Sequence, residues 1–447
     1  MKFALGVAVL AVFIILALRC MKRPGIALAL VWSMFGLEQI LQVNFPIFLQ
    51  YSWAINVGVG FATLIAVLGV LSKTNLKVNP PKQMIFFGLL MGLCCLSLAW
   101  CPDYDTSFDE LKKNFPLIVT FCLLAPLCVY RTEELQTAVN VMVYFGALVI
   151  FAMLFVKFGN RGFVVDYVGR KAVEANSLAA SQFAGYVGIC AVFSIYSGGK
   201  NNNIIAVIFK VCVTLVAMYL ILRSSSRGQL IAFIATCFFW LPIAAKMAAK
   251  RSTILALIFS FGVIAAGILT VGGQFSARWE IQHIESARDG RLQRNVDLIW
   301  IYLNEGPLAW MFGLGSSASF EVVGGYPHNV PVETLTEEGL FGFALLTLII
   351  GYTFKDALST MRMQLKKEAS DRINSSIVLA LFTYDFMLSM KQGTLLGSVP
   401  LFSFAITVGL MSVLRKQQKR ALKNRRQQYP HHLDPGGHLL GTPRNFR

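Results

Sequence analysis

A histidine and three glutamates lie within one short polar stretch, YPHNVPVETLTEEGLFG, which runs directly into an apolar segment. His328 carries an imidazole, and the ordinary histidine pKa of about 6.5 suits it to accept a proton from a hydroxyl near neutral pH. Asn329 and the following carboxylates, Glu337 among them, are groups that can orient an imidazole or contact a polar substrate. The stretch therefore predicts acid–base chemistry beside the apolar segment.

Arginines in three other segments are candidates for binding an anion. Arg227 follows three serines in SSSRGQL, Arg291 and Arg294 lie in DGRLQRNVDLIW, and Arg161 lies in a separate polar loop. Guanidinium groups match phosphate oxygens in bidentate fashion. A serine-rich turn at a helix N-terminus adds N–H groups and a positive dipole end. Together with His328, these residues predict a site for a pyrophosphate with a base beside it.

Each candidate also has a purely structural interpretation. Arg227 can extend to lipid headgroups at a helix end, and a single histidine in a Pro-flanked loop is commonly a surface or capping residue. Glu337 can stabilise a helix N-terminus through the helix dipole. The sequence has no His, Cys or carboxylate pattern with convincing metal-ligand spacing, so we expect neither a metal nor another cofactor.

The elements that position these residues are expected to be membrane helices. Of the 447 residues, 56% are hydrophobic and 14% are charged, against about 25% charged in an average soluble protein. Apolar runs of about 18–20 residues recur, which is long enough to cross a hydrocarbon core of about 30 Å. We predict an all-α, polytopic membrane protein of about 12–13 transmembrane helices. The expected spans are 3–19, 25–42, 53–72, 84–100, 114–130, 135–157, 177–196, 204–222, 229–245, 253–272, 338–354, 375–391 and 397–414.

The net charge of +17 indicates topology and does not predict nucleic-acid binding. Basic residues concentrate in short loops and in the tail RKQQKRALKNRRQQ. By the positive-inside bias, these loops and the C-terminus are cytoplasmic, and the intervening loops are periplasmic. Four parts follow: a bundle over 1–272, a periplasmic loop over 273–337, further spans over 338–414, and a basic cytoplasmic tail over 415–447 that we expect to be disordered.

The long periplasmic loop is expected to carry an amphipathic helix over 289–306. Leu292, Val296, Trp300 and Leu303 recur there at helical spacing. Such a helix can lie flat on the membrane surface as a lid over the bundle. An inert covering role is the alternative.

The notable charged residues within the expected spans are Glu38, Lys210 and Asp385. Charges at that depth are costly and are frequently functional. Asp385 is a candidate for an ion path. We favour the structural alternative, in which Asp385 pairs with Lys391 near the outer end of its helix.

The ordered segments SSSRGQLIAF, GRLQRNVDLIW, FGLGSSASF and PHNVPVETLTEEGLFG resemble those of the bacterial O-antigen ligase/polymerase superfamily. This superfamily includes the lipopolysaccharide O-antigen ligases, the O-antigen polymerases and related O-oligosaccharyltransferases. The segment EANSLAA also resembles the family's entry into a helix. The sequence departs from the family in having one span more than the usual twelve, and in Val296 and Asp297 where the family commonly has an aromatic residue.

The resemblance implies a metal-independent, inverting glycosyltransferase of the bacterial inner membrane. It would move a glycan from undecaprenyl pyrophosphate to an acceptor hydroxyl on the periplasmic face, with lipid A–core as the first choice among acceptors that the shared motifs do not separate. Arg227 and Arg291 would hold the pyrophosphate, and His328 would be the base or would orient the acceptor. Chain polymerisation and transfer to protein hydroxyls are alternative activities. A transporter or flippase for an anionic lipid-linked substrate, and a non-catalytic scaffold, are alternatives of other classes.

Overall fold

The computed structural model describes residues 2–73, 80–159, 175–196, 203–224, 226–245, 281–364 and 369–428. This part of the chain is almost entirely helical, with one pair of two-residue strands. The prediction of an all-α, multi-pass membrane protein is therefore confirmed. The expected span 253–272 and the candidate Arg161 lie outside the described residues.

The first half of the chain forms a succession of helices, one of them a π-helix (η1). Their bounds are α1 (Lys2–Arg19), α2 (Pro24–Asn44), α3 (Pro46–Gln50), α4 (Trp53–Lys73), α5 (Lys82–Ser97), α6 (Tyr104–Ile118), η1 (Val119–Leu124), α7 (Ala125–Leu127) and α8 (Thr132–Met153). Strands β1 (Phe158–Gly159) and β2 (Ala175–Asn176) pair in parallel. The helices that follow are α9 (Ser177–Ser194), α10 (Ile204–Arg223), α11 (Arg227–Ala245), α13 (Ile281–Asn304), α14 (Pro307–Phe312), α15 (Ser319–Val323), α16 (Val330–Glu337), α17 (Gly339–Gln364), α18 (Ala369–Ser389) and α19 (Val399–Gln428).

In the described part of the chain, eight helices are long and apolar enough to cross a membrane: α2, α4, α8, α9, α10, α11, α17 and α19. Helices α1 and α5 are shorter and apolar. The expected span 114–130 falls on α6, η1 and α7, where Pro116 lies inside a helix and cannot donate the usual backbone bond. The expected span 375–391 falls on α18.

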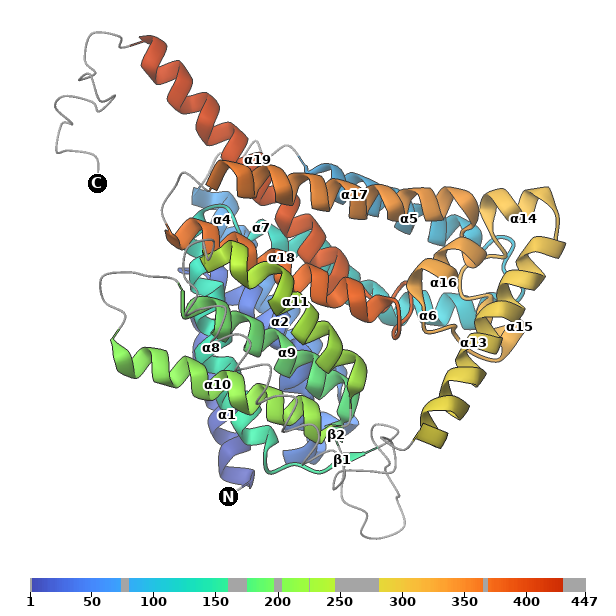
Figure 1. Cartoon of the computed structure of the whole chain (residues 1–447), viewed down its shortest axis with the longest axis horizontal. Coiled ribbons are helices and arrows are strands. Elements are labelled where there is room, and N and C mark those ends of the chain that lie inside the picture. The colour runs from blue at the N-terminus through green and yellow to red at the C-terminus, as the bar shows by residue number, and fades with distance from the viewer. Residues whose placement is uncertain are drawn as a thin grey trace.

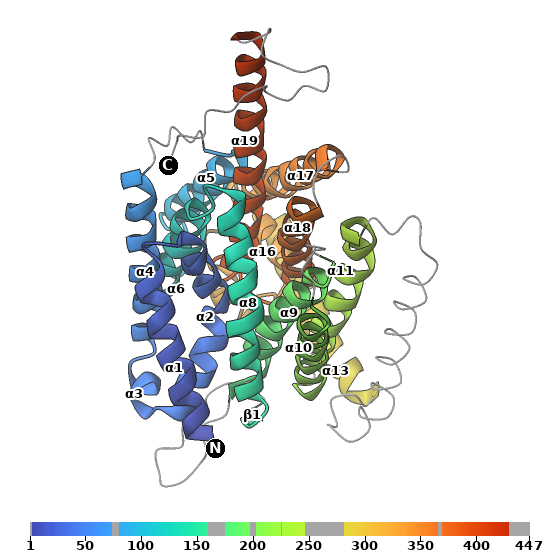
Figure 2. The same ribbon diagram turned by 90° about the vertical axis from the view of Figure 1, so that its left-hand side faces the viewer.

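Helix α2 is the centre of the bundle, because it packs against α1, α4, α8 and α9. Figure 2 shows α1, α2, α4 and α8 side by side, with α9, α10, α11 and α18 next to them. Nearly all of α2 is buried, whereas α10 exposes much of its apolar surface. An exposed apolar helix is stable when lipid covers it, so α10 is expected to line the bundle perimeter.

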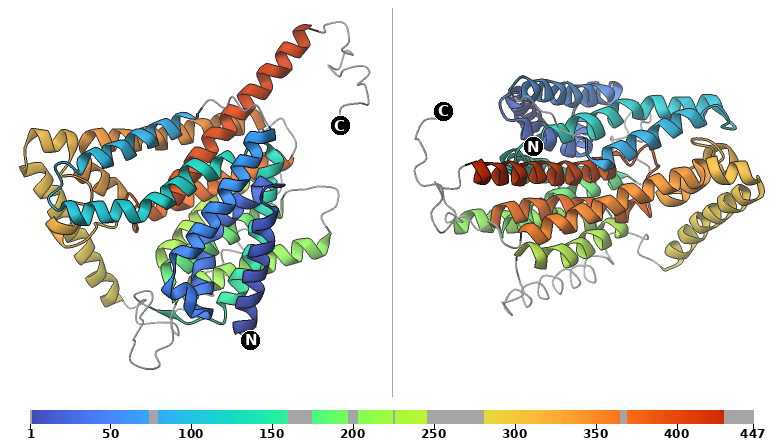
Figure 3. Two further views of the ribbon diagram at one scale, coloured as in Figure 1. Left: turned by 180° about the vertical axis from the view of Figure 1, so that it is seen from behind. Right: turned by 90° about the horizontal axis from the view of Figure 1, so that it is seen from above.

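Helices α13 to α16 gather at one end of the molecule, far from the C-terminal end of α19 (Figures 1 and 3). The junction of α5 and α6 joins them there. The Ser107 hydroxyl donates to the Ser316 carbonyl at 2.7 Å, and the Ser316 N–H donates to Ser97 Oγ at 3.0 Å. The α5–α6 junction and the long loop before α17 are both expected on the periplasmic side. They meet at one end of the molecule, as alternation of the expected spans predicts.

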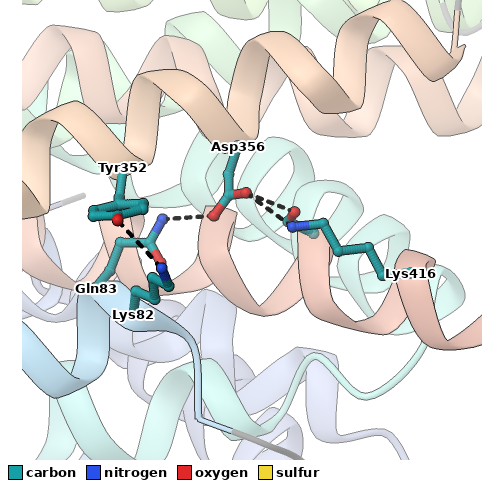
Figure 4. A network of polar contacts seen from close by, with 6 residues as sticks. Lys82, Gln83, Tyr352, Asp356 and Lys416 are labelled. Carbon is teal, nitrogen blue, oxygen red and sulfur yellow. Dashed lines mark hydrogen bonds and ion pairs between the residues drawn. The ribbon is translucent and has the colours of Figure 1, made fainter.

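Asp356 ties α5, α17 and α19 together elsewhere along these helices (Figure 4). Its carboxylate accepts from Gln83 Nε2 at 3.1 Å, from Ser412 Oγ at 2.9 Å and from Lys416 Nζ at 3.3 Å. Lys416 belongs to the expected disordered tail, yet α19 continues to Gln428. The expectation of disorder is wrong for residues 415–428, since Lys, Arg and Gln are good helix formers and the next proline is Pro430.

Candidate functional site

His328 lies immediately before α16 in a left-handed backbone conformation, with φ of 59°. Non-glycine residues seldom adopt positive φ, and such strain concentrates at functional sites. The half-buried imidazole packs edge-on against the Tyr326 ring, with the ring centroids 4.3 Å apart. Tyr326 in turn contacts Phe320 of α15. The imidazole is therefore held in one orientation by neighbouring rings.

Asn329 is the N-cap of α16, because its side-chain oxygen accepts from the Val332 N–H at 3.2 Å. Asparagine is among the preferred N-cap residues, since it satisfies one of the N–H groups that a helix start leaves open. Pro331 stands in the first turn, where a missing N–H has no cost. Asn329 thus defines the start of α16, and its contact with substrate stays a prediction.

Glu337 holds the serine-rich turn that precedes α15. Its two carboxylate oxygens accept from the backbone N–H groups of Ser317 at 2.8 Å and Ser319 at 3.1 Å. Gly313 and Gly339, both with positive φ, let this turn approach the end of α16, because a side chain at Gly313 would collide with the Glu337 carbonyl. The observed contacts of Glu337 are therefore to backbone, and a role in substrate binding requires a further contact.

The three glutamates of the segment are all buried, with 4% of Glu333, 2% of Glu337 and none of Glu338 exposed. Burial raises the pKa of Glu337 to about 7, and the serine N–H groups oppose that shift. Burial also raises the pKa of Glu333, and the neighbouring Glu337 adds to the effect. One oxygen of Glu333 has no hydrogen-bond partner within the described part of the chain. The cluster therefore favours protonated carboxyls.

Ionisation of this cluster is expected to make folding stability pH-dependent. A carboxyl whose folded pKa lies above its unfolded value of about 4.3 binds more protons when folded. The contribution of such a carboxyl to folding stability is complete below about pH 4.3. For Glu337 this contribution is lost as the pH rises through about 7. We expect Glu333→Gln to remove part of the loss between pH 5 and pH 8, because the glutamine keeps the acceptor for the Leu395 N–H. Melting temperatures across this range measure the effect.

The matched control is Glu133→Gln, because Glu133 is exposed in the first turn of α8. This control should keep the wild-type pH profile. The same decline in melting temperature for wild type and Glu333→Gln would show that Glu333 is already ionised in the folded protein.

The loop between α18 and α19, residues 390–398, joins α16 to the start of α11. The Leu395 N–H donates to Glu333 Oε1 at 2.9 Å. On the other side, Gln229 Nε2 donates to Gln392 Oε1 at 2.7 Å. The ammonium of Lys391 lies against Gly228, where a side chain would collide with it. One loop therefore positions both α16, which follows His328, and the helix that begins with Arg227.

The structure places the predicted arginines that it describes on two different helices, α11 and α13. Arg227 is the first residue of α11 and is half-buried, and its neighbours Gly228 and Gln229 contact the 390–398 loop. Arg294 of α13 lies next to Gly325, close in the chain to His328. Arg291 is part of α13, and its side chain lies outside the described residues. Arg294 and the His328 loop are thus neighbours, and Arg227 is linked to them through the 390–398 loop.

Arg223, which shares the RSSSRG turn with Arg227, has a structural role. Its guanidinium donates to the carbonyls of Leu154 and, at 3.0 Å, Val156, and lies 5.2 Å from the Phe158 ring centre. It closes the end of α8 against α10. The two arginines of one turn therefore have different surroundings, which their spacing in the sequence does not reveal.

The amphipathic helix is present as α13 and is longer than expected, because it begins at Ile281. It packs against α14, α15 and α16, with Leu298 and Tyr302 buried. Its predicted apolar stripe remains exposed, with Trp300 67% and Leu292 54% accessible. An exposed apolar stripe is typical of a helix that lies at a membrane surface.

The 390–398 loop was not predictable from the sequence as a part of the site. Its residues Lys391, Gln392 and Gly393 follow an apolar helix, which is the ordinary signature of a span end. The one available signal was Gly393, which adopts positive φ and thus marks a specific turn. Partners more than 150 positions away along the chain, such as Gln229, carry no local signal.

Comparison with known proteins gives no family assignment: no protein-family model matches the chain, and no curated protein matches it. The fold defines the class, a multi-pass α-helical membrane protein with an additional helical layer, α13 to α16, at one end of the bundle. Among the described residues, no group of three or more His, Cys, Asp or Glu side chains has the geometry to hold a metal.

Proposed function

We propose that this protein is a glycosyltransferase of the inner membrane that moves a glycan from undecaprenyl pyrophosphate to an acceptor hydroxyl on the periplasmic face. The observation that carries the proposal is the fixed position of His328. The residue is strained, is packed on Tyr326, and precedes an α16 that is braced through Glu333 and Glu337. A rigid imidazole whose loop lies next to Arg294 of α13 suits transfer from an anionic leaving group.

The proposed reaction is a single displacement at the anomeric carbon. The acceptor oxygen forms a bond to that carbon, and the carbon–oxygen bond to the pyrophosphate breaks with its electron pair on the pyrophosphate. His328 takes the proton from the acceptor hydroxyl, or orients that hydroxyl for attack. Arg227, Arg291 and Arg294 stabilise the charge that develops on the leaving group. A single displacement inverts the anomeric configuration.

Lipid A–core is the acceptor that we propose first, with a second lipid-linked glycan or a protein hydroxyl as the alternatives. The test supplies purified protein in lipid with a radiolabelled undecaprenyl pyrophosphate glycan and offers each acceptor separately. Label on lipid A–core identifies a ligase, and lengthened lipid-linked glycan identifies a polymerase. Label that stays on the donor, but crosses a sealed vesicle bilayer, would replace the transferase with a flippase.

Transfer is expected to proceed without a divalent cation, because arginine side chains supply the positive charge that a metal would otherwise bring. Treatment with EDTA should leave the initial rate unchanged. The measurement is the rate of label transfer before and after chelation, followed by re-addition of Mg²⁺ or Mn²⁺. Loss of activity that returns with either cation would contradict the metal-independent mechanism.

A further inference from the structure

A cavity of about 380 Å³ with a mixed polar and apolar lining lies between α2, α9, α18 and the 390–398 loop. Volumes in this range accommodate small molecules or part of a larger ligand. The cavity is separate from His328, yet Gln392 on its wall bonds to Gln229 of α11. Leu395 of the same loop bonds to Glu333 of α16. The loop is therefore one wall of the cavity and also a support of the candidate catalytic segment.

The lining combines carboxylates with primary amides. Its hydrogen-bonding groups include Glu38 and Gln39 of α2, Gln182 of α9, Asp385 of α18, and Gln392 of the loop. Carboxylates accept hydrogen bonds, and amides both donate and accept. This mixture matches the hydroxyl groups of a sugar, each of which also donates and accepts. Phe35, Leu388 and Leu401 add an apolar surface that suits the C–H face of a pyranose ring.

The lining is held rigid by contacts that span the bundle. Asp385 is 3% exposed and accepts from Tyr186 Oη at 2.8 Å and from Gln182 Nε2 at 2.9 Å. Gln39 accepts from the Asn176 N–H at 2.7 Å. Two residues of α9 thus supply hydrogen bonds to Asp385, and its expected pairing with Lys391 stays a prediction. Fixed polar groups around a cavity favour a ligand that pairs with them, since unpaired buried groups are costly.

The charge of the lining selects among ligands. Glu38 and Asp385 carry carboxyl groups, and no Lys or Arg is among the described residues that line the cavity. A phosphate or a uronic acid placed there would face two carboxyl groups and would find no Lys or Arg side chain on the described lining. A neutral sugar or an amino sugar would bring no negative charge next to these carboxyl groups. The arginines on the neighbouring elements provide the complementary place for a pyrophosphate.

We propose that this cavity is a glycan subsite that binds a neutral or amino-substituted sugar unit and rejects acidic sugars. This inference rests on the proposed transferase activity for its biological meaning, while binding itself is measurable without turnover. The pyrophosphate end of the donor would lie with the arginines, and a sugar unit would occupy the cavity behind the 390–398 loop.

The first test measures binding with a cysteine at the cavity wall. The Ser398→Cys protein is labelled with a maleimide in the presence of methyl glucoside, methyl glucosaminide or methyl glucuronide, and peptide mass spectrometry measures the extent of labelling. These three sugars share one ring and differ in charge. We expect the first two to slow labelling severalfold and the glucuronide to have no effect. The native Cys101, which is half-buried in the α5–α6 junction and outside the cavity, is the internal control.

The second test fills the cavity and uses the donor glycan itself. Ala179 lines the cavity on α9, so Ala179→Phe should raise KM for a neutral glycan donor at least tenfold with little change in kcat. Ala206→Phe is the matched control, because Ala206 lies on α10 outside the lining. Melting temperatures of both variants confirm folding.

The two tests separate the subsite from the transferase. Protection without any transfer activity would support the sugar site and contradict the proposed function. Transfer with unchanged KM in Ala179→Phe would overturn the subsite and leave the function intact. Equal protection by the glucuronide would overturn the charge selection. If the Phe variant fails to fold, absence of protection by both the glucoside and the glucosaminide overturns the subsite.

Discussion

Replacement of His328 by alanine is expected to lower the transfer rate by roughly 10²–10⁴-fold, the usual contribution of a general base. The loss should fall on kcat, because in the proposed reaction the imidazole acts on the acceptor proton as the new bond forms. Initial rates with saturating donor and varied acceptor separate kcat from KM. The prediction rests on the geometry of His328, whose ring is held against Tyr326 at the start of α16.

The backbone of His328 makes alanine an imperfect replacement. With φ of 59°, an alanine at this position is strained by about 1–2 kcal/mol, and the start of α16 can shift. His328→Asn is the better variant, because asparagine tolerates this conformation and lacks a base of useful pKa. We expect His328→Asn to melt like wild type and to be as inactive as the alanine variant. Full turnover by a folded His328→Asn protein would remove the imidazole from the mechanism.

Loss of the Arg227 guanidinium is expected to reduce the transfer rate by roughly 10²–10³-fold, as for other groups that stabilise developing charge. Arg227→Lys should retain part of the rate, because the ammonium keeps the charge but not the bidentate geometry. The effect should be larger with a pyrophosphate donor than with a neutral activated sugar donor. Steady-state rates with the two donors measure this difference.

Arg131→Ala is the matched control for Arg227. Arg131 is an exposed arginine at the N-terminus of α8, and its guanidinium lies 5.1 Å from the Tyr130 ring centre. It has the same charge but lies on the side that we assign to the cytoplasm, so its replacement should leave transfer unchanged. Equal losses in both variants would indicate a general effect of positive charge on membrane association. An unchanged rate in Arg227→Ala would assign Arg227 to the headgroup interface.

The helical elements of this protein were predictable because their signals are local. Burial in lipid demands long apolar runs whose backbone bonds close within the segment. Such runs are visible in α2, α4 and α10 without any knowledge of their neighbours. The cap at Asn176, inside the segment EANSLAA, is also local, since its side chain bonds to Leu178 and Ala179. The extent of α13 and α19 was underestimated, because charged helix formers carry no hydropathy signal.

Residue types and their order along the chain determined that His328, the arginines and the glutamates are candidates for one functional site. The tertiary structure alone decided what each one contacts. Glu337 holds backbone N–H groups of a serine turn, and Arg223 closes a helix end. Asp385 bonds to Gln182, which is 203 positions away along the chain. Hydrogen bonds between distant segments depend on how the helices pack, and packing is set by the shape of whole surfaces and not by the spacing of residues within one of them.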